Sequence, residues 1–157
     1  MDELEYQIKH LPKDAVLVKM RLNGNTDTLA LVRRVIAASV KHIPLSASLL
    51  NDIVMATTEA CTNVIKHAYH FDENKYFELE LKVTNELFVV EVEYFDKGFD
   101  PEKIPVPNLA EPREGGLGVF IIKQIMDFVK YKVNPEDGAV LLTMVKQLAS
   151  SDRALEA

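Results

Sequence analysis

The stretch EACTNVIKHAY, from Glu59 to Tyr69, lies in a segment whose apolar residues recur at helical spacing. Glu59 and Asn63 are four residues apart, so their side chains stand about 40° apart, one turn above the other. Lys66 and His67 continue the same line. A solvated face is the ordinary reading of such a polar stripe. Asn63 favours a functional site instead, because asparagine is unfavourable inside a helix and offers no charge to solvent.

The elements around this helix are predicted from hydrophobic periodicity. Alternating apolar residues indicate strands, and apolar residues at every third or fourth position indicate helices. Thr26 or Asp27 is expected to cap the first helix, and Ser46 or Ser48 the second. The predicted order is strand 15–22, helix 29–42, helix 49–71, strand 76–83, strand 87–95, long loop 96–118, helix 119–129, strand 129–133 and strand 139–146.

These elements predict an α/β fold. The strands at 76–83 and 87–95 have one apolar and one charged face, which fits a sheet covered by helices on one side only. We therefore expect a two-layer α/β sandwich with a mixed, mostly antiparallel sheet and three helices on one face. One domain is expected over residues 1–157, with its core at about 14–147.

Composition excludes several functional classes. The formal net charge of −6 argues against direct binding to nucleic acid, because such proteins carry a basic patch. No window of 18 apolar residues is present, so no membrane span is expected. Cys61 is the single cysteine, which rules out an internal disulfide and fits a reducing compartment. The cytoplasm is the predicted location.

The loop at 96–118 breaks the regular pattern, with four of the seven prolines and four of the six glycines. Long loops of this kind are usually functional lids or disordered segments. It ends in GGLG, Gly115 to Gly118, directly before a predicted helix. Glycines allow close backbone approach, and the free N–H groups of a helix N-terminus bind anions. The motif alone also fits a flexible loop, and it matches neither a P-loop nor a Rossmann fingerprint.

Three motifs in this order resemble those of the gyrase and histidine-kinase type ATPases, which share the Bergerat fold. EACTNVIKHAY resembles the N box, GFDP at Gly98 to Pro101 resembles the end of the first glycine box, and GGLGVFIIKQIMD resembles the second. The length of the chain and the residues of these motifs resemble a narrower group, the anti-sigma-factor serine kinases of bacterial partner-switching systems. The resemblance covers about residues 14–147.

The resemblance implies roles for the matching residues. Asn63 would hold the Mg²⁺ ion that bridges the phosphates of ATP, and Glu59 would be the catalytic general base. The glycines of 115–118 would wrap the phosphates, residues at about 100–116 would form the ATP lid, and Lys66 and His67 would line the rim. The cofactor-binding candidates are Asn63, Lys66, His67, Asp96, Gly98, Gly115, Gly116, Leu117 and Gly118.

One segment departs from the family pattern D-x-G-x-G-F-D-P, whose aspartate receives the adenine amino group. Without gaps, Tyr94 stands where that aspartate belongs and Asp96 stands where the first glycine belongs. With a two-residue deletion, Asp96 becomes the adenine ligand and Gly98 the first glycine. Both residues fall on the inward register of the strand, so parity does not decide. We favour Asp96 as the adenine ligand.

The implied function is an anti-sigma factor with serine/threonine protein kinase activity. It would use ATP and Mg²⁺ to phosphorylate a STAS-type anti-sigma-factor antagonist, and in its other complex it would sequester a sigma factor. The resemblance also allows a homodimer. The alternative, prompted by Tyr94 and Asp96, is a degenerate module that binds protein partners without catalysis. A detached histidine-kinase catalytic domain is a third reading, which the lack of coiled-coil heptads disfavours.

Overall fold

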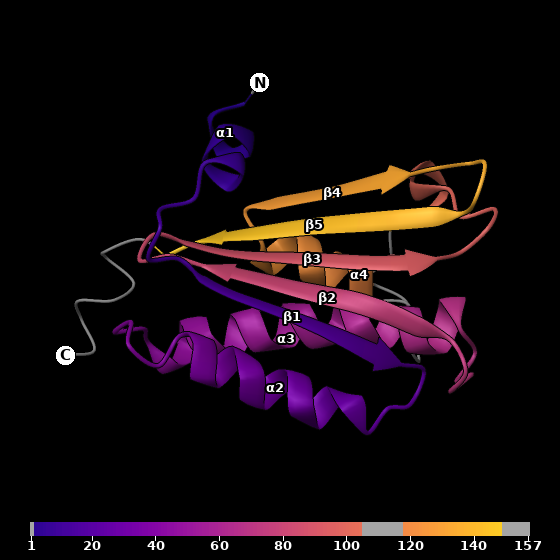
Figure 1. Cartoon of the computed structure of the whole chain (residues 1–157), viewed down its shortest axis with the longest axis horizontal. Helices are drawn as coiled ribbons and strands as arrows, with labels where there is room; N and C mark the ends of the chain where they lie inside the picture. The colour runs from indigo at the N-terminus through magenta and orange to yellow at the C-terminus, as the bar shows by residue number, and fades with distance from the viewer. Residues whose placement is uncertain (1, 105–117, 149–157) are drawn as a thin grey trace, which may run out of the picture.

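A five-stranded sheet forms one layer of the structure, and helices form the other (Figure 1). The computed structural model describes residues 2–104 and 118–148. The strand order is β1-β2-β3-β5-β4, and all four pairings are antiparallel. The strands are β1 (Val16–Asn23), β2 (Tyr76–Val83), β3 (Leu87–Phe95), β4 (Phe128–Val133) and β5 (Ala139–Gln147).

The predicted fold class is confirmed, with one refinement of the sheet. A mixed sheet would require a parallel pair, and none occurs among the described residues. Short turns join β2 to β3 and β4 to β5, and such hairpins pair their strands antiparallel.

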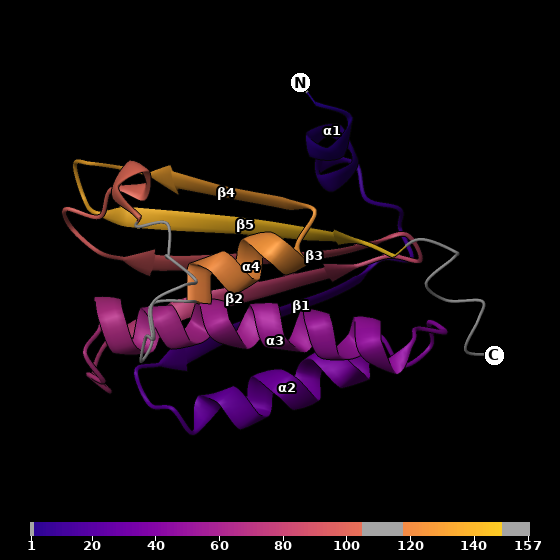
Figure 2. The ribbon, with the colours of Figure 1, turned by 180° about the vertical axis from the view of Figure 1, so that it is seen from behind.

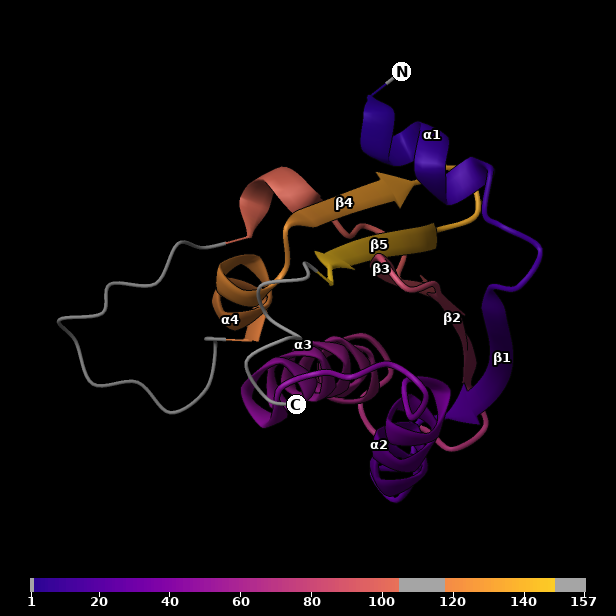
Figure 3. The same ribbon diagram turned by 90° about the vertical axis from the view of Figure 1, so that its left-hand side faces the viewer.

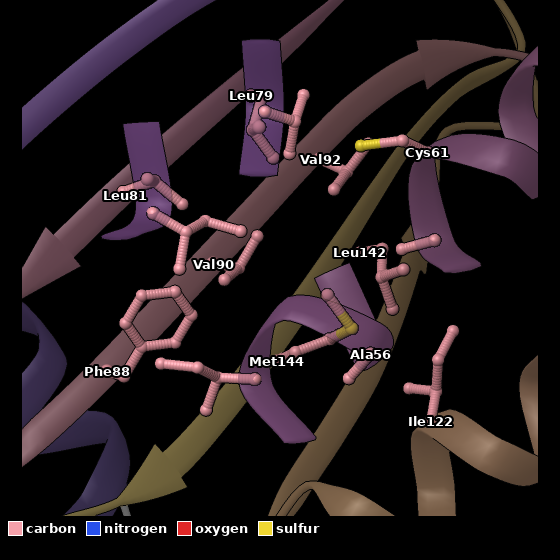
Figure 4. Close-up of a cluster of buried hydrophobic side chains, with 14 of the residues drawn as sticks. Ala56, Cys61, Leu79, Leu81, Phe88, Val90, Val92, Ile122, Leu142 and Met144 are labelled. Atoms are coloured by element: carbon pink, nitrogen blue, oxygen red, sulfur yellow. The ribbon is translucent and has the colours of Figure 1, made fainter. Parts of the chain in front are cut away.

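Three helices cover one face of the sheet, as predicted (Figures 2 and 3). They are α2 (Thr28–Ser39), α3 (Ala47–Asn63) and α4 (Gly118–Ile125). The alternating side chains of the strands turn their apolar members toward these helices, because successive residues of a strand point to opposite faces. Figure 4 shows the resulting core, which includes Ala56, Cys61, Leu79, Leu81, Phe88, Val90, Val92, Ile122, Leu142 and Met144.

A fourth helix, α1 (Glu3–Lys9), was not predicted. Its Leu4 and Ile8 are half-buried and pack on the opposite face of the sheet, against Leu87, Val89 and Val145. Two apolar residues four positions apart give only a short helical pattern in an otherwise polar segment. The helix therefore depends on this contact, which is not visible in the local sequence.

The helix ends differ from the predictions at the start of α2 and at the end of α4, whereas the predicted cap of α3 is confirmed. Neither Thr26 nor Asp27 caps α2 through its side chain; instead, the Asn25 carbonyl accepts a hydrogen bond from the Thr28 N–H at 3.1 Å. Ser46 caps α3, and its hydroxyl accepts from the Leu49 N–H at 3.0 Å. The third helix ends at Ile125, earlier than expected, and only Ile122 within it is buried.

The early end of α4 has a clear cause in the hydrogen bonds of Asp127, two residues after its last residue. The Asp127 N–H donates to the Val145 carbonyl at 2.9 Å, and the Asp127 carboxylate accepts from the Gln147 N–H at 2.7 Å. The chain therefore joins β5 at this point. Phe128, predicted as helical, belongs to β4, as does Val129, which the predicted helix and the predicted strand shared.

Candidate functional site

The C-terminal turn of α3 and the first residue of α4 lie against each other. A Cβ atom on Gly118 would come within 2.9 Å of Glu59 Oε2 and 3.0 Å of Asn63 Oδ1. Cβ atoms rarely approach other atoms so closely, so glycine lets the start of α4 lie here without displacing these two side-chain ends. The contact brings together the backbone of the second glycine motif and two polar side chains of the N-box-like motif.

A cavity of about 310 Å³ lies beside this contact. Its volume is at the lower end of the range of small-molecule sites, about 300–1,000 Å³. Most of its surface is apolar, with a few polar groups among the lining residues. The lining residues are Asn63, His67, Ala68, Tyr94, Asp96, Phe99, Ile104, Gly118, Val119 and Tyr131.

A tight turn at the end of β3 places two of these residues in the cavity. The Phe99 N–H donates to the Asp96 carbonyl at 3.1 Å, which closes a four-residue turn. Gly98, the third residue of the turn, has φ +94°, in the left-handed region that favours glycine. Gly98 is exposed and does not line the cavity. It shapes the turn that returns Phe99 beside Asp96.

Aromatic rings form much of the cavity wall. Phe99 lies between two tyrosines, with ring centroids 6.4 Å from Tyr94 and 5.3 Å from Tyr131. Burial raises the pKa of Tyr131 to about 12. Burial, together with the nearby Tyr131 and Asp96, holds the pKa of Tyr94 well above its ordinary value. Both hydroxyls therefore stay protonated at neutral pH.

Sequence reasoning did not assign Phe99, Ile104 or Tyr131 to the site, and it treated Tyr94 only as a departure from the motif. A signal in the sequence was present for Tyr94. Tyr94 falls on the inward register of its strand in the sequence itself. Tyr131 is placed only by the observed register, in which it lies opposite inward-facing Leu142. For Ile104 we find no comparable signal.

The predicted line of polar residues along α3 breaks after Asn63. Residues Val64–Ala68 form a π-helical turn, η1, in which the Tyr69 N–H donates to the Val64 carbonyl at 2.8 Å. A π-turn holds more residues than an α-turn and so changes the direction of the side chains that follow. His67 lines the cavity, whereas Lys66 is exposed and does not.

Some predicted site residues fall outside the described part of the chain. Gly115, Gly116 and Leu117 are among them, as is most of the predicted lid at about 100–116. The first residues of that lid, Pro101–Lys103, form a short 3₁₀ turn, η2.

The oxygen ligands near Gly118 are compatible with a magnesium ion. Within residues 2–104 and 118–148, no group of three His, Cys, Asp or Glu side chains could hold a metal on its own. Mg²⁺ is usually bound by one or two protein oxygens together with substrate phosphates. The amide oxygen of Asn63 and the carboxylate of Glu59, which approach Gly118 together, are donors of this kind.

The fold and the site define a class of protein. Residues 22–146 match the family model of the histidine kinase-like ATPase domain, and the chain belongs to that family. This confirms the resemblance drawn from the three motifs. The described part of the chain contains no helix with the length and apolar character needed to cross a bilayer.

Individual relatives agree with the narrower resemblance. The chain is 29% identical over 141 residues to "Serine-protein kinase RsbW" of Halalkalibacterium halodurans, covering 83% of each chain. It is 25% identical to "Serine-protein kinase RsbW" of Oceanobacillus iheyensis, covering 86% of this chain and 89% of the relative. A crystal structure of RsbU and RsbW domains from Mycobacterium tuberculosis shares the fold, with a TM-score of 0.59 and 14% identity. That match covers 83% of this chain and 32% of the other.

Proposed function

We propose that the chain is an anti-sigma factor with serine/threonine protein kinase activity, which uses ATP to phosphorylate an anti-sigma-factor antagonist in a bacterial partner-switching system. Family membership indicates the nucleotide, and relatives named as serine-protein kinases indicate the reaction. One observation of the structure carries the proposal: the backbone of Gly118 lies against Glu59 and Asn63 beside a cavity that Asp96 also lines.

Each residue has a proposed role in this reaction. Asp96 accepts a hydrogen bond from the adenine amino group, because an ionised carboxylate is a pure acceptor. Asn63 holds Mg²⁺ through its amide oxygen, and Glu59 takes the proton from the attacking serine or threonine hydroxyl. The backbone at Gly118, with the glycines that precede it, binds the phosphates. When bound, Mg²⁺ neutralises charge on the phosphates of ATP.

The proposed partners are a STAS-type antagonist and a sigma factor. Phosphorylation adds about −1.5 to −2 charge to the antagonist and weakens a complex by repulsion and by the cost of desolvation. Direct binding to nucleic acid is not part of the proposal, because the net charge is −6. We further propose a single ATPase domain in the cytoplasm, able to form a homodimer.

The degenerate, non-catalytic module is not favoured. Its motivation was that the adenine ligand could be missing, and Asp96 does reach the cavity. The relatives named above are also described as kinases.

The decisive experiment mixes the chain with radiolabelled ATP, Mg²⁺ and the cognate antagonist. Wild type should transfer label to a serine or threonine of the antagonist. Glu59→Gln should reduce the rate by at least about 100-fold while ATP binding persists, because general-base catalysis contributes about 10²–10⁴-fold. Glu136→Gln, an exposed substitution in the β4–β5 turn, serves as the control and should transfer at the wild-type rate. Absence of transfer by wild type, or unchanged transfer by Glu59→Gln, would refute the proposal.

A further inference from the structure

Tyr94 is a buried tyrosine whose hydroxyl has no hydrogen-bond partner among the described residues, although its side chain is only 7% exposed. The contrast with Tyr69, which is 3% exposed, is informative. The Tyr69 hydroxyl donates to the Tyr76 carbonyl at 2.8 Å and accepts from the Phe95 N–H at 3.2 Å. Buried tyrosine hydroxyls usually find such partners, so the Tyr94 hydroxyl calls for an explanation.

The surroundings of Tyr94 indicate where its partner comes from. Tyr94 lines the 310 Å³ cavity, and its ring is held edge-on against Phe99. Asp96 follows two residues later on the same face of the chain and lines the same cavity. A phenol is protonated at neutral pH, so the hydroxyl can donate, whereas an ionised carboxylate only accepts. One wall of the cavity thus presents a donor and an acceptor to whatever fills it.

The edge of adenine has the complementary pattern. Its exocyclic amino group donates, and the neighbouring ring nitrogen N1 accepts. We propose that the Tyr94 hydroxyl donates a hydrogen bond to N1 of the adenine ring while Asp96 accepts from the amino group, which makes Tyr94 a specificity-determining residue of this chain. The inference rests on the proposed function, because it concerns the same nucleotide site. It assigns recognition of the adenine ring to Tyr94, the residue that departs from the family motif.

The test compares ATP with 1-deaza-ATP, in which N1 is replaced by a C–H group, by calorimetry on the full chain. Wild type should bind ATP about fivefold more tightly than 1-deaza-ATP, the value of one neutral hydrogen bond. Tyr94→Phe removes only the hydroxyl and should bind both nucleotides with the same affinity. Tyr76→Phe, which removes a hydroxyl from an exposed ring that does not line the cavity, should keep the wild-type preference.

A thermal melt of the free proteins separates this role from a structural one. The hydroxyl has no partner within the described chain, so Tyr94→Phe should melt no lower than wild type. A lower melting temperature together with an unchanged nucleotide preference would overturn the inference and assign Tyr94 to the fold.

The outcomes also separate this inference from the proposed function. If wild type binds ATP but does not discriminate against 1-deaza-ATP, or if Tyr94→Phe still discriminates, the inference alone fails. If wild type binds neither nucleotide, the proposed function fails and the inference fails with it.

Discussion

Gly118 shows how one residue can matter to a site without carrying a functional group. Two effects oppose each other when alanine replaces it. Alanine is a better helix residue than glycine, by up to about 1 kcal/mol in a helix interior and by less at the first position of α4, whereas overpacking costs about 1–3 kcal/mol. The atoms that a Cβ would meet belong to the side chains of Glu59 and Asn63, which are able to move aside. The fold should therefore tolerate a substitution that displaces both candidate ligands.

We predict that Gly118→Ala changes the free energy of unfolding by less than about 1 kcal/mol, because the helix gain offsets the clash. Phosphoryl transfer should fall by at least about 10-fold, since a displacement of about 1 Å can cost about 100-fold. Urea unfolding and label transfer measure the two effects.

Gly98→Ala is the control: its Cβ would meet nothing within 4 Å, but φ +94° would strain the backbone. It should lose stability by about 1–2 kcal/mol. Wild-type transfer by Gly118→Ala would contradict the prediction.

Tyr131 gives a prediction for the alkaline limit of stability. Burial raises its pKa from the ordinary 10.0 to about 12 in the folded chain. Between these values the unfolded chain has lost the phenolic proton while the folded chain keeps it, so stability falls as pH rises. Below pH 10 the contribution is fully present. The loss should reach about 2 kcal/mol by pH 12.

Between pH 10 and 12, Tyr131→Phe should therefore require more urea to unfold than wild type. At pH 8 the two proteins should unfold at similar urea concentrations. Tyr131→Phe should still lose some stability at alkaline pH, because burial also raises the pKa of Tyr94. Tyr6→Phe is the matched control, because that ring is 54% exposed. An identical alkaline decline in wild type and Tyr131→Phe would show that the Tyr131 proton does not contribute.

At the scale of elements, the π-turn η1 and the end of β3 are joined by one side chain. Tyr69 follows η1 directly, and its hydroxyl connects the Tyr76 carbonyl of β2 with the Phe95 N–H of β3. Phe95 lies between the two cavity residues Tyr94 and Asp96. The hydrogen bonds of Tyr69 thus connect the end of the N-box-like motif to the strand that carries the candidate adenine ligand.

Tyr69→Phe should cost about 1–3 kcal/mol in the free energy of unfolding, because it leaves a main-chain N–H and a main-chain carbonyl without this partner. ATP affinity should fall as well, since Phe95 adjoins Asp96. Urea unfolding and calorimetry measure these losses, with the exposed Tyr76→Phe as the control. A variant as stable as wild type would show that water replaces the hydroxyl at both groups.

Some elements could be predicted from sequence and others could not, for physical reasons that differ. The strands with alternating residues, such as 76–83, were predicted with their observed bounds, because fully buried positions alternate with less buried ones. Helix α1 was missed because its stability comes from the distant Val89 and Val145. The π-turn was missed because nothing in VIKHA differs in composition from an α-helix.

The candidate site divides in the same way. The motifs indicated Glu59, Asn63, Asp96 and Gly118, and the structure places all four around one region of the fold. Tyr131 comes from β4, far away in sequence, and enters the cavity only through the pairing of β4 with β5. Strand order is a property of the whole sheet, so a motif search within one segment does not reveal such a residue.

At the scale of the whole molecule, ligand binding should increase the free energy of unfolding. A ligand that binds only the folded state stabilises it by about 2.7 kcal/mol at 100 times its dissociation constant. For a chain of 157 residues this corresponds to a rise in melting temperature of roughly 5–10 °C. The rise should be larger with ATP and Mg²⁺ than with ATP and a chelator, because the proposed metal ligand Asn63 acts only when the ion is present.

Asn63→Ala isolates the metal contribution from the rest of the binding energy. Without nucleotide, helix propensity should not make this variant less stable than wild type, because alanine is favoured over asparagine in a helix. ATP should still raise the melting temperature through Asp96, but the additional rise caused by Mg²⁺ should disappear. Asn74→Ala, at an exposed asparagine outside the cavity, is the matched control and should keep that additional rise. A magnesium-dependent increment of wild-type size in Asn63→Ala would remove Asn63 from the metal site. Another oxygen of the chain, such as the Glu59 carboxylate that also approaches Gly118, would then have to hold the ion.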